Sequence, residues 1–253
     1  MKKILLSVIT VVVLATSGMQ VSFAQDGGPP QFRPVELWAC QYKDGKDKGD
    51  MDKVYEGIVE STSDAAYAAW HLSPYFVGNL QQQFDFIYLG AWADGTTFGG
   101  DLASYMADSA DVASEWDETV DCASLMFASN TIQPNPGAGD GNGEFVLTVS
   151  DCDVAHGRTA AQALGAIRRF NDYRVANGMT IGTFAWFPVF GGGDADFSFK
   201  LAQAYSGAQA LGDGFQWSVD NQAYNVEGDM TDGLVSCDES RVYFGSTIMD
   251  NLN

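Results

Sequence analysis

His71 and Glu36 are the residues of this sequence best suited to moving a proton. An imidazole changes charge near neutral pH, and a neighbouring carboxylate can serve as its acid or base partner. The chain has two histidines, and only His71 lies in a strand-like segment, because His156 follows Cys152 in a segment typical of a loop. An enzyme would therefore use His71 with Glu36 or Trp38 nearby. The simpler alternative is a structural histidine whose hydrogen bonds are satisfied within the fold.

A second set of side chains is suited to holding a ligand. Apolar and mixed polar residues alternate along residues 35–40 and 147–152, as in strands with two different faces. We expect the apolar set (Val35, Leu37, Ala39, Leu147 and Val149) to pack under helices. Glu36, Trp38, Thr148 and Ser150 would then line the opposite face. Arg241 lies in the last strand and would either pair with a carboxylate ligand or form a surface salt bridge. The predicted ligand-binding residues are Trp38, His71, Tyr75, Thr148, Ser150 and Arg241.

Familiar catalytic motifs are missing from the sequence. It contains no Gly-x-Ser-x-Gly, no phosphate-binding loop, no His-Glu-x-x-His and no Cys-x-x-Cys. The four cysteines are far apart in sequence, and two histidines give little basis for a metal centre. We therefore predict neither a metal site nor a cofactor.

The elements that must position these side chains follow one order twice. Strand-like runs at residues 35–39 and 145–149 each end near a cysteine, and a helix follows each, weakly indicated at 51–59 and clearly at 159–176. The second strand contains a proline, so it should lie at a sheet edge or carry a bulge there. The remaining elements are a third strand from Phe84 or Phe197, a second helix over residues 101–118 or 208–224, and a fourth strand from Cys122 or Cys237.

The two halves of the chain form a predicted internal repeat. Residues 70–76 (WHLSPYF) match residues 184–190 (FAWFPVF), and further landmarks recur in the same order. Coincidence in an aromatic-rich chain is the alternative. The repeats span residues 34–132 and 144–253, and a linker rich in Pro, Gly and Asn joins them at 133–143. Each has the order β-α-β-β-α-β of a ferredoxin-like unit, so the predicted fold class is α+β.

This topology selects one of the three ways to pair four cysteines. The sheet order of a ferredoxin-like unit is 4-1-3-2, so strand one lies antiparallel beside strand four. A cysteine that ends strand one then meets a cysteine that begins strand four, which predicts the disulfides Cys40–Cys122 and Cys152–Cys237. Oxidised cysteines suit an exported chain.

Residues 1–24 have the pattern of a signal peptide, with a basic start, an apolar core and Ser22-Phe23-Ala24 before the cleavage point. The apolar core is shorter than the ~20 residues that span a bilayer, and no later segment qualifies. Residues 25–33 should form a disordered lead-in. We expect an exported protein, periplasmic or secreted. The net charge of −20 argues against binding nucleic acid or anionic lipid.

Two loose motifs and the element order carry a family resemblance. Residues 35–37 lead into Tyr42-x-x-Gly45-Lys46, and Trp92-x-Asp94 leads towards the second helix. With these features the chain resembles the dimeric α+β barrel superfamily, which includes antibiotic-biosynthesis monooxygenases and NIPSNAP-like proteins. The resemblance implies that a tandem duplication closes the barrel within one chain, and hence a monomer with pseudo-twofold symmetry.

Three functions remain open at this point, because that superfamily includes enzymes, stress proteins and binding modules. The leading hypothesis is an exported protein that binds a small apolar or aromatic molecule in the barrel between the two repeats. The second is a monooxygenase or isomerase-type enzyme that needs no cofactor and uses His71. The third is a structural protein of the cell envelope that acts through its surface.

Overall fold

The computed structural model describes residues 32–62, 66–78, 83–108, 110–134, 143–193 and 195–252. The expected signal peptide and most of the expected linker lie outside these residues, so both stay predictions. The expected lead-in is two residues too long, because Phe32 and Arg33 already belong to a strand.

The described chain contains strands and helices in nearly equal amounts. The strands are β1 (Phe32–Tyr42), β2 (Tyr67–Phe76), β3 (Phe86–Trp92), β4 (Val120–Gln133), β5 (Glu144–Val154), β6 (Gly182–Phe190), β7 (Phe199–Tyr205), β8 (Val235–Cys237) and β9 (Arg241–Asp250). The helices are α1 (Lys48–Ser61), α2 (Gly95–Asp108), α3 (Ala110–Thr119), α4 (Ala160–Ala176), α5 (Ala208–Asp220) and α6 (Ala223–Thr231).

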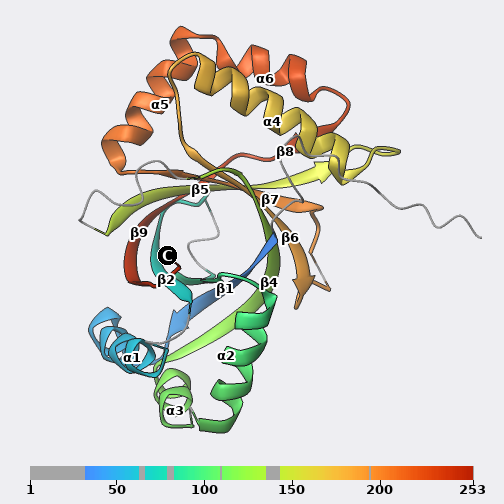
Figure 1. Cartoon of the computed structure of the whole chain (residues 1–253). Helices are drawn as coiled ribbons and strands as arrows, with labels where there is room; N and C mark the ends of the chain where they lie inside the picture. Colours follow the sequence, from blue (N-terminus) through green and yellow to red (C-terminus); the bar gives the residue numbers. More distant parts are fainter. Residues whose placement is uncertain are drawn as a thin grey trace, which may run out of the picture. The chain divides into compact units, whose positions relative to one another are not determined.

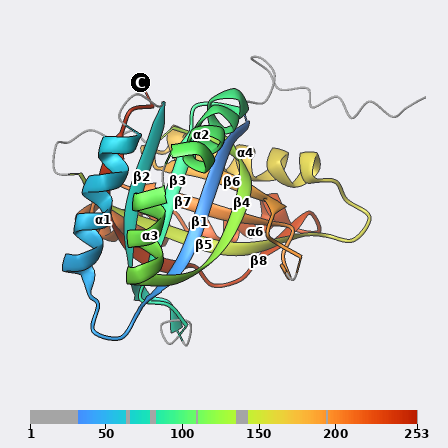
Figure 2. The same ribbon diagram turned by 90° about the horizontal axis from the view of Figure 1, so that it is seen from below.

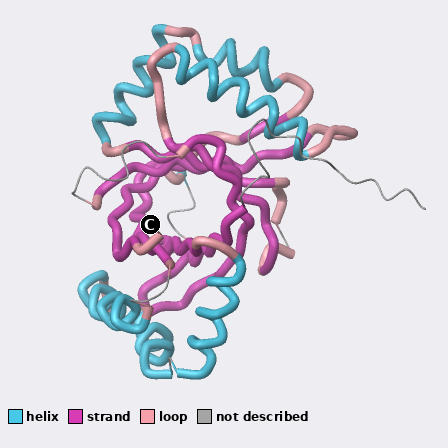
Figure 3. The backbone as a smooth tube through the Cα atoms, viewed as in Figure 1, coloured by secondary structure: helices cyan, strands magenta, loops and turns pink. Residues whose placement is uncertain are grey.

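Eight of the strands close into an antiparallel barrel. Neighbours in the sheet follow the order β7-β6-β4-β1-β3-β2-β9-β5, and pairing of β5 with β7 closes the ring, which Figure 3 shows end-on. The short strand β8 pairs with the C-terminal end of β5 and is not part of the ring. The expected 4-1-3-2 order is observed as β4-β1-β3-β2 and as β9-β5-β7-β6. Pairs β4–β6 and β2–β9 join these two sets of strands.

The helices cover the barrel from two opposite sides. Helices α1, α2 and α3 lie on one side, and α4, α5 and α6 lie on the other (Figure 1; Figure 2 shows the first group from below). Each long second helix expected from the sequence is in fact a pair, α2 with α3 and α5 with α6. Helix α4 begins where expected, because the N-cap residue Thr159 and Gln162 form a reciprocal capping box. No helix in the described residues combines the length and apolar character needed to cross a membrane.

Both expected disulfides are present. Cys40 on β1 is bonded to Cys122 on β4, and Cys152 on β5 is bonded to Cys237 on β8. Each pair of cysteines consists of directly opposed residues in an antiparallel ladder. The topological argument from the sequence therefore selected the right pairing.

Proline disturbs the second strand of each half, as expected. The pairing of β2 with β9 shifts register between Pro74 and Phe76. The pairing of β6 with β4 shifts in the same way beside Pro188. Since proline cannot donate a hydrogen bond to the ladder, a bulge at these points lets both strands stay inside a closed barrel.

Apolar residues form three clusters that correspond to the barrel interior and its two helix-covered sides. The interior cluster takes residues from both halves, among them Leu37, Leu147 and Trp186. A second cluster packs β1–β4 against α1 and includes Met51 and Tyr55. The third cluster packs strands β5, β6 and β7 against α4 and includes Leu164. The interior cluster is apolar, so a charged side chain beside it calls for an explanation.

Candidate functional site

A cavity of about 120 Å³ lies inside the barrel. Its wall is mainly apolar, and charged side chains lie together in one part of it. The lining residues are Leu37, Leu72, Phe84, Ile87, Leu147, Val149, Asp151, Trp186, Lys200, Arg241 and Tyr243. A cavity of this size and character is suited to a small ring-containing molecule.

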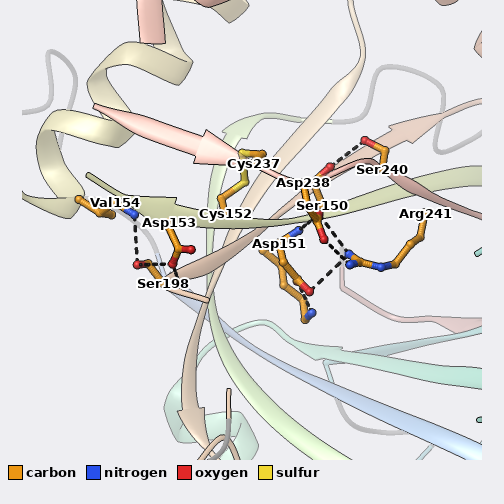
Figure 4. The surroundings of a disulfide bond; sticks show 11 residues. Ser150, Asp151, Cys152, Asp153, Val154, Ser198, Cys237, Asp238, Ser240 and Arg241 are labelled. Carbon is orange, nitrogen blue, oxygen red and sulfur yellow. Dashed lines mark hydrogen bonds and ion pairs between the residues drawn. A yellow bond between two sulfur atoms is a disulfide. The ribbon is translucent and has the colours of Figure 1, made fainter. Parts of the chain in front are cut away.

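The ionic end of the cavity is formed by Asp151, Lys200 and Arg241. The Lys200 ammonium forms an ion pair with Asp151 Oδ1, and Arg241 Nη1 lies 3.4 Å from Asp151 Oδ2. Arg241 Nη2 also pairs with Asp238, which lies outside the cavity lining (Figure 4). The side chains of Lys200 and Arg241 are 14% and 20% exposed, so both cations are largely withdrawn from water.

The second disulfide and the strand register position these charges. Asp151 and Lys200 are directly opposed on β5 and β7. Asp151 immediately precedes Cys152, and Asp238 immediately follows Cys237, so the disulfide brings the two carboxylates together. The backbone N–H of Asp151 donates to Asp238 Oδ1 at 2.8 Å, and that of Asp238 donates to the Asp151 carbonyl at 2.9 Å. Arg241 then has two fixed carboxylates beside it.

The ionic end offers more hydrogen-bond donors than acceptors to the cavity. An ammonium carries three N–H groups and a guanidinium carries five, and neither accepts. Lys200 also lies 4.1 Å from the centre of the Phe197 ring. Burial raises the pKa of Tyr243 to about 12, against a smaller lowering by Arg241, so the phenol keeps its proton. The Tyr243 hydroxyl makes no hydrogen bond to the described residues, and such a group can serve as a further donor.

A separate polar cluster lies on the helix-covered side of strands β1, β2 and β3. The Tyr67 hydroxyl donates to Glu36 Oε1 at 2.6 Å, and the Trp38 indole N–H donates to Oε2 at 2.8 Å. The Tyr88 hydroxyl lies 2.7 Å from that of Tyr67. Burial raises the pKa of the Glu36 carboxyl, and the hydrogen bonds from Tyr67 and Trp38 offset part of this effect. The protonated form of this carboxyl is therefore more favoured than that of an exposed glutamate.

His71 lies in the same layer as this cluster. Its ring is buried, stacks on Phe86 at 4.7 Å between ring centres, and shares a 2.8 Å hydrogen bond between Nδ1 and the Tyr55 hydroxyl. Burial lowers the pKa of His71 to about 4, and Lys48 adds to the shift. The imidazole is therefore neutral at pH 7, and its contacts are those of a structural histidine.

Comparison with known proteins identifies the architecture. A protein assigned as a monooxygenase from Lactobacillus acidophilus superposes with a TM-score of 0.55 at 11% identity, over 87% of this chain and 95% of its own. A second, from Fusobacterium nucleatum, gives 0.55 at 8% identity, over 86% and 93%. A protein assigned as a chlorite dismutase gives 0.52 at 8% identity, over 88% and 97%. This chain has the dimeric α+β barrel fold.

No family model and no curated protein sequence matches the chain. At such low identity the structural likeness establishes the fold and leaves the reaction open. The α+β barrel must therefore be interpreted from its own side chains.

The two faces of the barrel strands lie the opposite way round from the arrangement expected from the sequence. Leu37, Leu147 and Val149 line the cavity, whereas Cys152, on the opposite face of β5, packs with Leu164 of α4. Glu36, Trp38, Thr148 and Ser150 consequently point towards the helices. The reason is that the barrel interior is largely withdrawn from bulk water, so it takes the more apolar face.

The other expected site residues are dispersed. His71 and Glu36 share one layer, as expected for a pair, but this layer is outside the barrel. Tyr75 is 54% exposed and contacts Phe244 at the surface. Among the expected ligand-binding residues, Arg241 alone lines the cavity, and it also makes the salt bridges that were its alternative interpretation.

Asp151 and Lys200 line the cavity although neither is among the site residues expected from the sequence. A signal for Asp151 was present, because it continues the alternation of Leu147 and Val149 onto the interior face as a charged residue. Lys200 likewise alternates with Phe199, which packs under α4. A charge at the end of an apolar face is unexpected in a core and therefore indicates a site.

Proposed function

We propose that this protein binds a small apolar or aromatic molecule inside the α+β barrel. The observation that carries the proposal is the interior cavity of about 120 Å³ with its apolar wall. An apolar protein cavity of ~150 Å³ accepts one benzene molecule, so a cavity of about 120 Å³ admits at most a single ring. Trp186 and Tyr243 present aromatic side chains to such a ring.

Export, an internal duplication and a monomeric state are the further properties that we propose for a binding protein acting outside the cytoplasm. Two disulfides stabilise the chain, as is usual where thiols become oxidised. We infer that residues 1–24 direct export, to the periplasm or beyond, and that a duplication produced the two halves. Because the barrel closes within one chain, we propose that the protein works as a monomer with pseudo-twofold symmetry.

Titration calorimetry and thermal shifts with neutral ring compounds, toluene and indole, test this function. Binding should raise the melting temperature of the intact protein and change the fluorescence of Trp186. Val149→Phe fills the cavity and should abolish both effects, while Val175→Phe, at a position 42% exposed on α4, should preserve them. Absence of heat and of a thermal shift across the series in the unmodified protein would refute the proposal.

The hydrogen-bonded chain of Glu36, Tyr67 and Tyr88 supports a second candidate function, catalysis without a cofactor. Proteins with this fold include some assigned as monooxygenases. In this alternative Glu36 would transfer a proton to or from a substrate at the helix-covered layer, with His71 nearby. Oxygen consumption with small phenols tests it. Glu36→Gln should abolish turnover, and a His71→Ala variant that retains it would remove His71 from the mechanism.

A further inference from the structure

We propose that the ligand of the barrel cavity is a small aromatic carboxylate, whose ring lies against the apolar wall and whose carboxylate binds Lys200 and Arg241. This inference rests on the proposed binding function and adds the chemical class of the ligand. It also assigns roles: Lys200 and Arg241 contact the anion, and Asp151 positions the two cations.

The first half of the barrel shows that its fold does not require charges at this place. Ala39 immediately precedes Cys40 on β1 and is directly opposed to Ile87 on β3. In the second half Asp151 immediately precedes Cys152 and is directly opposed to Lys200. The same register therefore holds an apolar pair in one half and an ion pair in the other.

Placing the ion pair in the interior has an energetic cost that an apolar pair avoids. Removing two charges from water is often not repaid by their mutual attraction, and apolar replacements are commonly neutral or stabilising. Asp151 retains 26% exposure and Lys200 only 14%, so both are substantially desolvated. Because the first half of the barrel accepts the apolar pair Ala39 and Ile87, the second half does not need an ion pair at this place for its structure. We therefore infer that the ion pair serves to bind a ligand.

The balance of donors and acceptors determines the charge of the ligand. Both oxygens of Asp151 already face cations, Lys200 at Oδ1 and Arg241 at Oδ2. The cations keep N–H groups beyond these contacts, and the Tyr243 hydroxyl adds another donor near them. The groups that line this end carry two positive charges and one negative charge, and Asp238 balances Arg241 from outside the lining. The excess that faces the cavity is therefore one of hydrogen-bond donors, which an anionic acceptor complements, and a carboxylate matches the guanidinium geometry.

The apolar wall limits the remainder of the ligand. Leu37, Ile87 and Leu147 offer no polar side-chain atoms, and the cavity volume of about 120 Å³, which includes the ionic end, limits the ligand to a single ring. Benzoate is therefore the probe that matches the site in both size and charge. Benzamide and benzyl alcohol have nearly the same shape without the charge.

Calorimetric titration of the whole protein with these three probes tests the inference. Benzoate should bind at least tenfold more tightly than benzamide or benzyl alcohol. The double variant Asp151→Ala/Lys200→Ile, which copies the Ala39–Ile87 pair, should reduce this preference to less than threefold while neutral rings still bind. The matched control Asp121→Ala/Lys43→Ile removes an exposed ion pair beside Cys122 and should leave the preference unchanged.

The outcomes separate this inference from the function on which it rests. If neutral rings bind and benzoate has no advantage in the unmodified protein, the carboxylate inference is overturned and the binding function stands. If no ring compound binds, the binding function fails and this inference fails with it. The comparison of probes in the unmodified protein decides both points even if the double variant does not fold.

Discussion

Asp151 and Lys200 face each other across β5 and β7 and form an ion pair inside the barrel, one residue from a disulfide. The position of this pair connects the second disulfide with the charged end of the cavity. The covalent bond between Cys152 and Cys237 stabilises the chain, and it also fixes Asp151 and Asp238 next to Arg241.

The two disulfides should therefore differ in their effect on binding. Removing either bond as a double Cys→Ser variant should lower the free energy of unfolding by about 4 kcal/mol, as the chain-entropy model gives for loops of this length. The two losses should be similar because the closed loops span 82 and 85 residues. Loss of Cys152–Cys237 should also weaken benzoate binding at least fivefold. Loss of Cys40–Cys122, the matched control, should not. Calorimetry on both variants measures this, and equal weakening would contradict the positioning role.

Replacing the ion pair should affect stability in a characteristic way. Asp151→Ala alone leaves Lys200 without its partner and should lower the free energy of unfolding by about 2 kcal/mol, less than for a fully buried pair because a quarter of Asp151 is exposed. Asp151→Ala/Lys200→Ile should recover most of that loss. Urea unfolding of both variants is the measurement. A double variant less stable than the single one would show that the fold depends on these charges.

His71 should make stability depend on pH between about 6.5 and 4. Its pKa is about 4 in the folded protein and 6.5 in an ordinary environment, so the unfolded chain takes up a proton first as the pH falls. This uptake should lower the free energy of unfolding by about 3 kcal/mol across that window, with full stability above it.

Urea unfolding at several pH values measures the effect of His71. His71→Asn should remove most of this dependence relative to the unmodified protein. His156→Asn, at an exposed position, is the control and should leave it in place. An unchanged pH dependence in His71→Asn would rule out the buried neutral imidazole as its source.

Gly90 should be required for the Glu36 cluster. A Cβ atom at this position would lie 2.1 Å from the Tyr67 hydroxyl and 2.5 Å from Glu36 Oε1, so the hydrogen bond between them could not persist. Gly90→Ala should lower the free energy of unfolding by about 2–3 kcal/mol. Gly99→Ala, in the open on α2, should raise it by up to about 1 kcal/mol. Thermal unfolding compares the two, and equal stability of both variants would argue against a tightly packed cluster.

Much of the architecture could be predicted from the sequence, because it depends on local patterns and topology. The strand that ends at Cys40 and the helix that follows Thr159 are encoded by alternation and by a capping box. The 4-1-3-2 order then gave both disulfides. The split of each second helix is not evident from the sequence, because neither junction (residue 109 and residues 221–222) contains a glycine or a proline.

The site could not be predicted to the same extent, because it depends on which face of a strand closes into the barrel. Alternation along β5 separates Leu147 from Thr148 but does not say which of them faces inward. Glu36 looked suitable for a polar barrel lining, yet its partner Tyr67 comes from another strand and satisfies it outside the barrel. Long-range pairing of this kind leaves no trace in the local pattern.

The most direct test of the central claim is to locate benzoate on the protein by NMR. In a methyl-labelled sample, the ring protons should show nuclear Overhauser effects to the methyl groups of Leu37, Leu147 and Val149, which line the cavity. Contacts confined to exposed methyl groups, such as those of Val175 on α4 and Val219 on α5, would place the ligand outside the barrel and contradict the account.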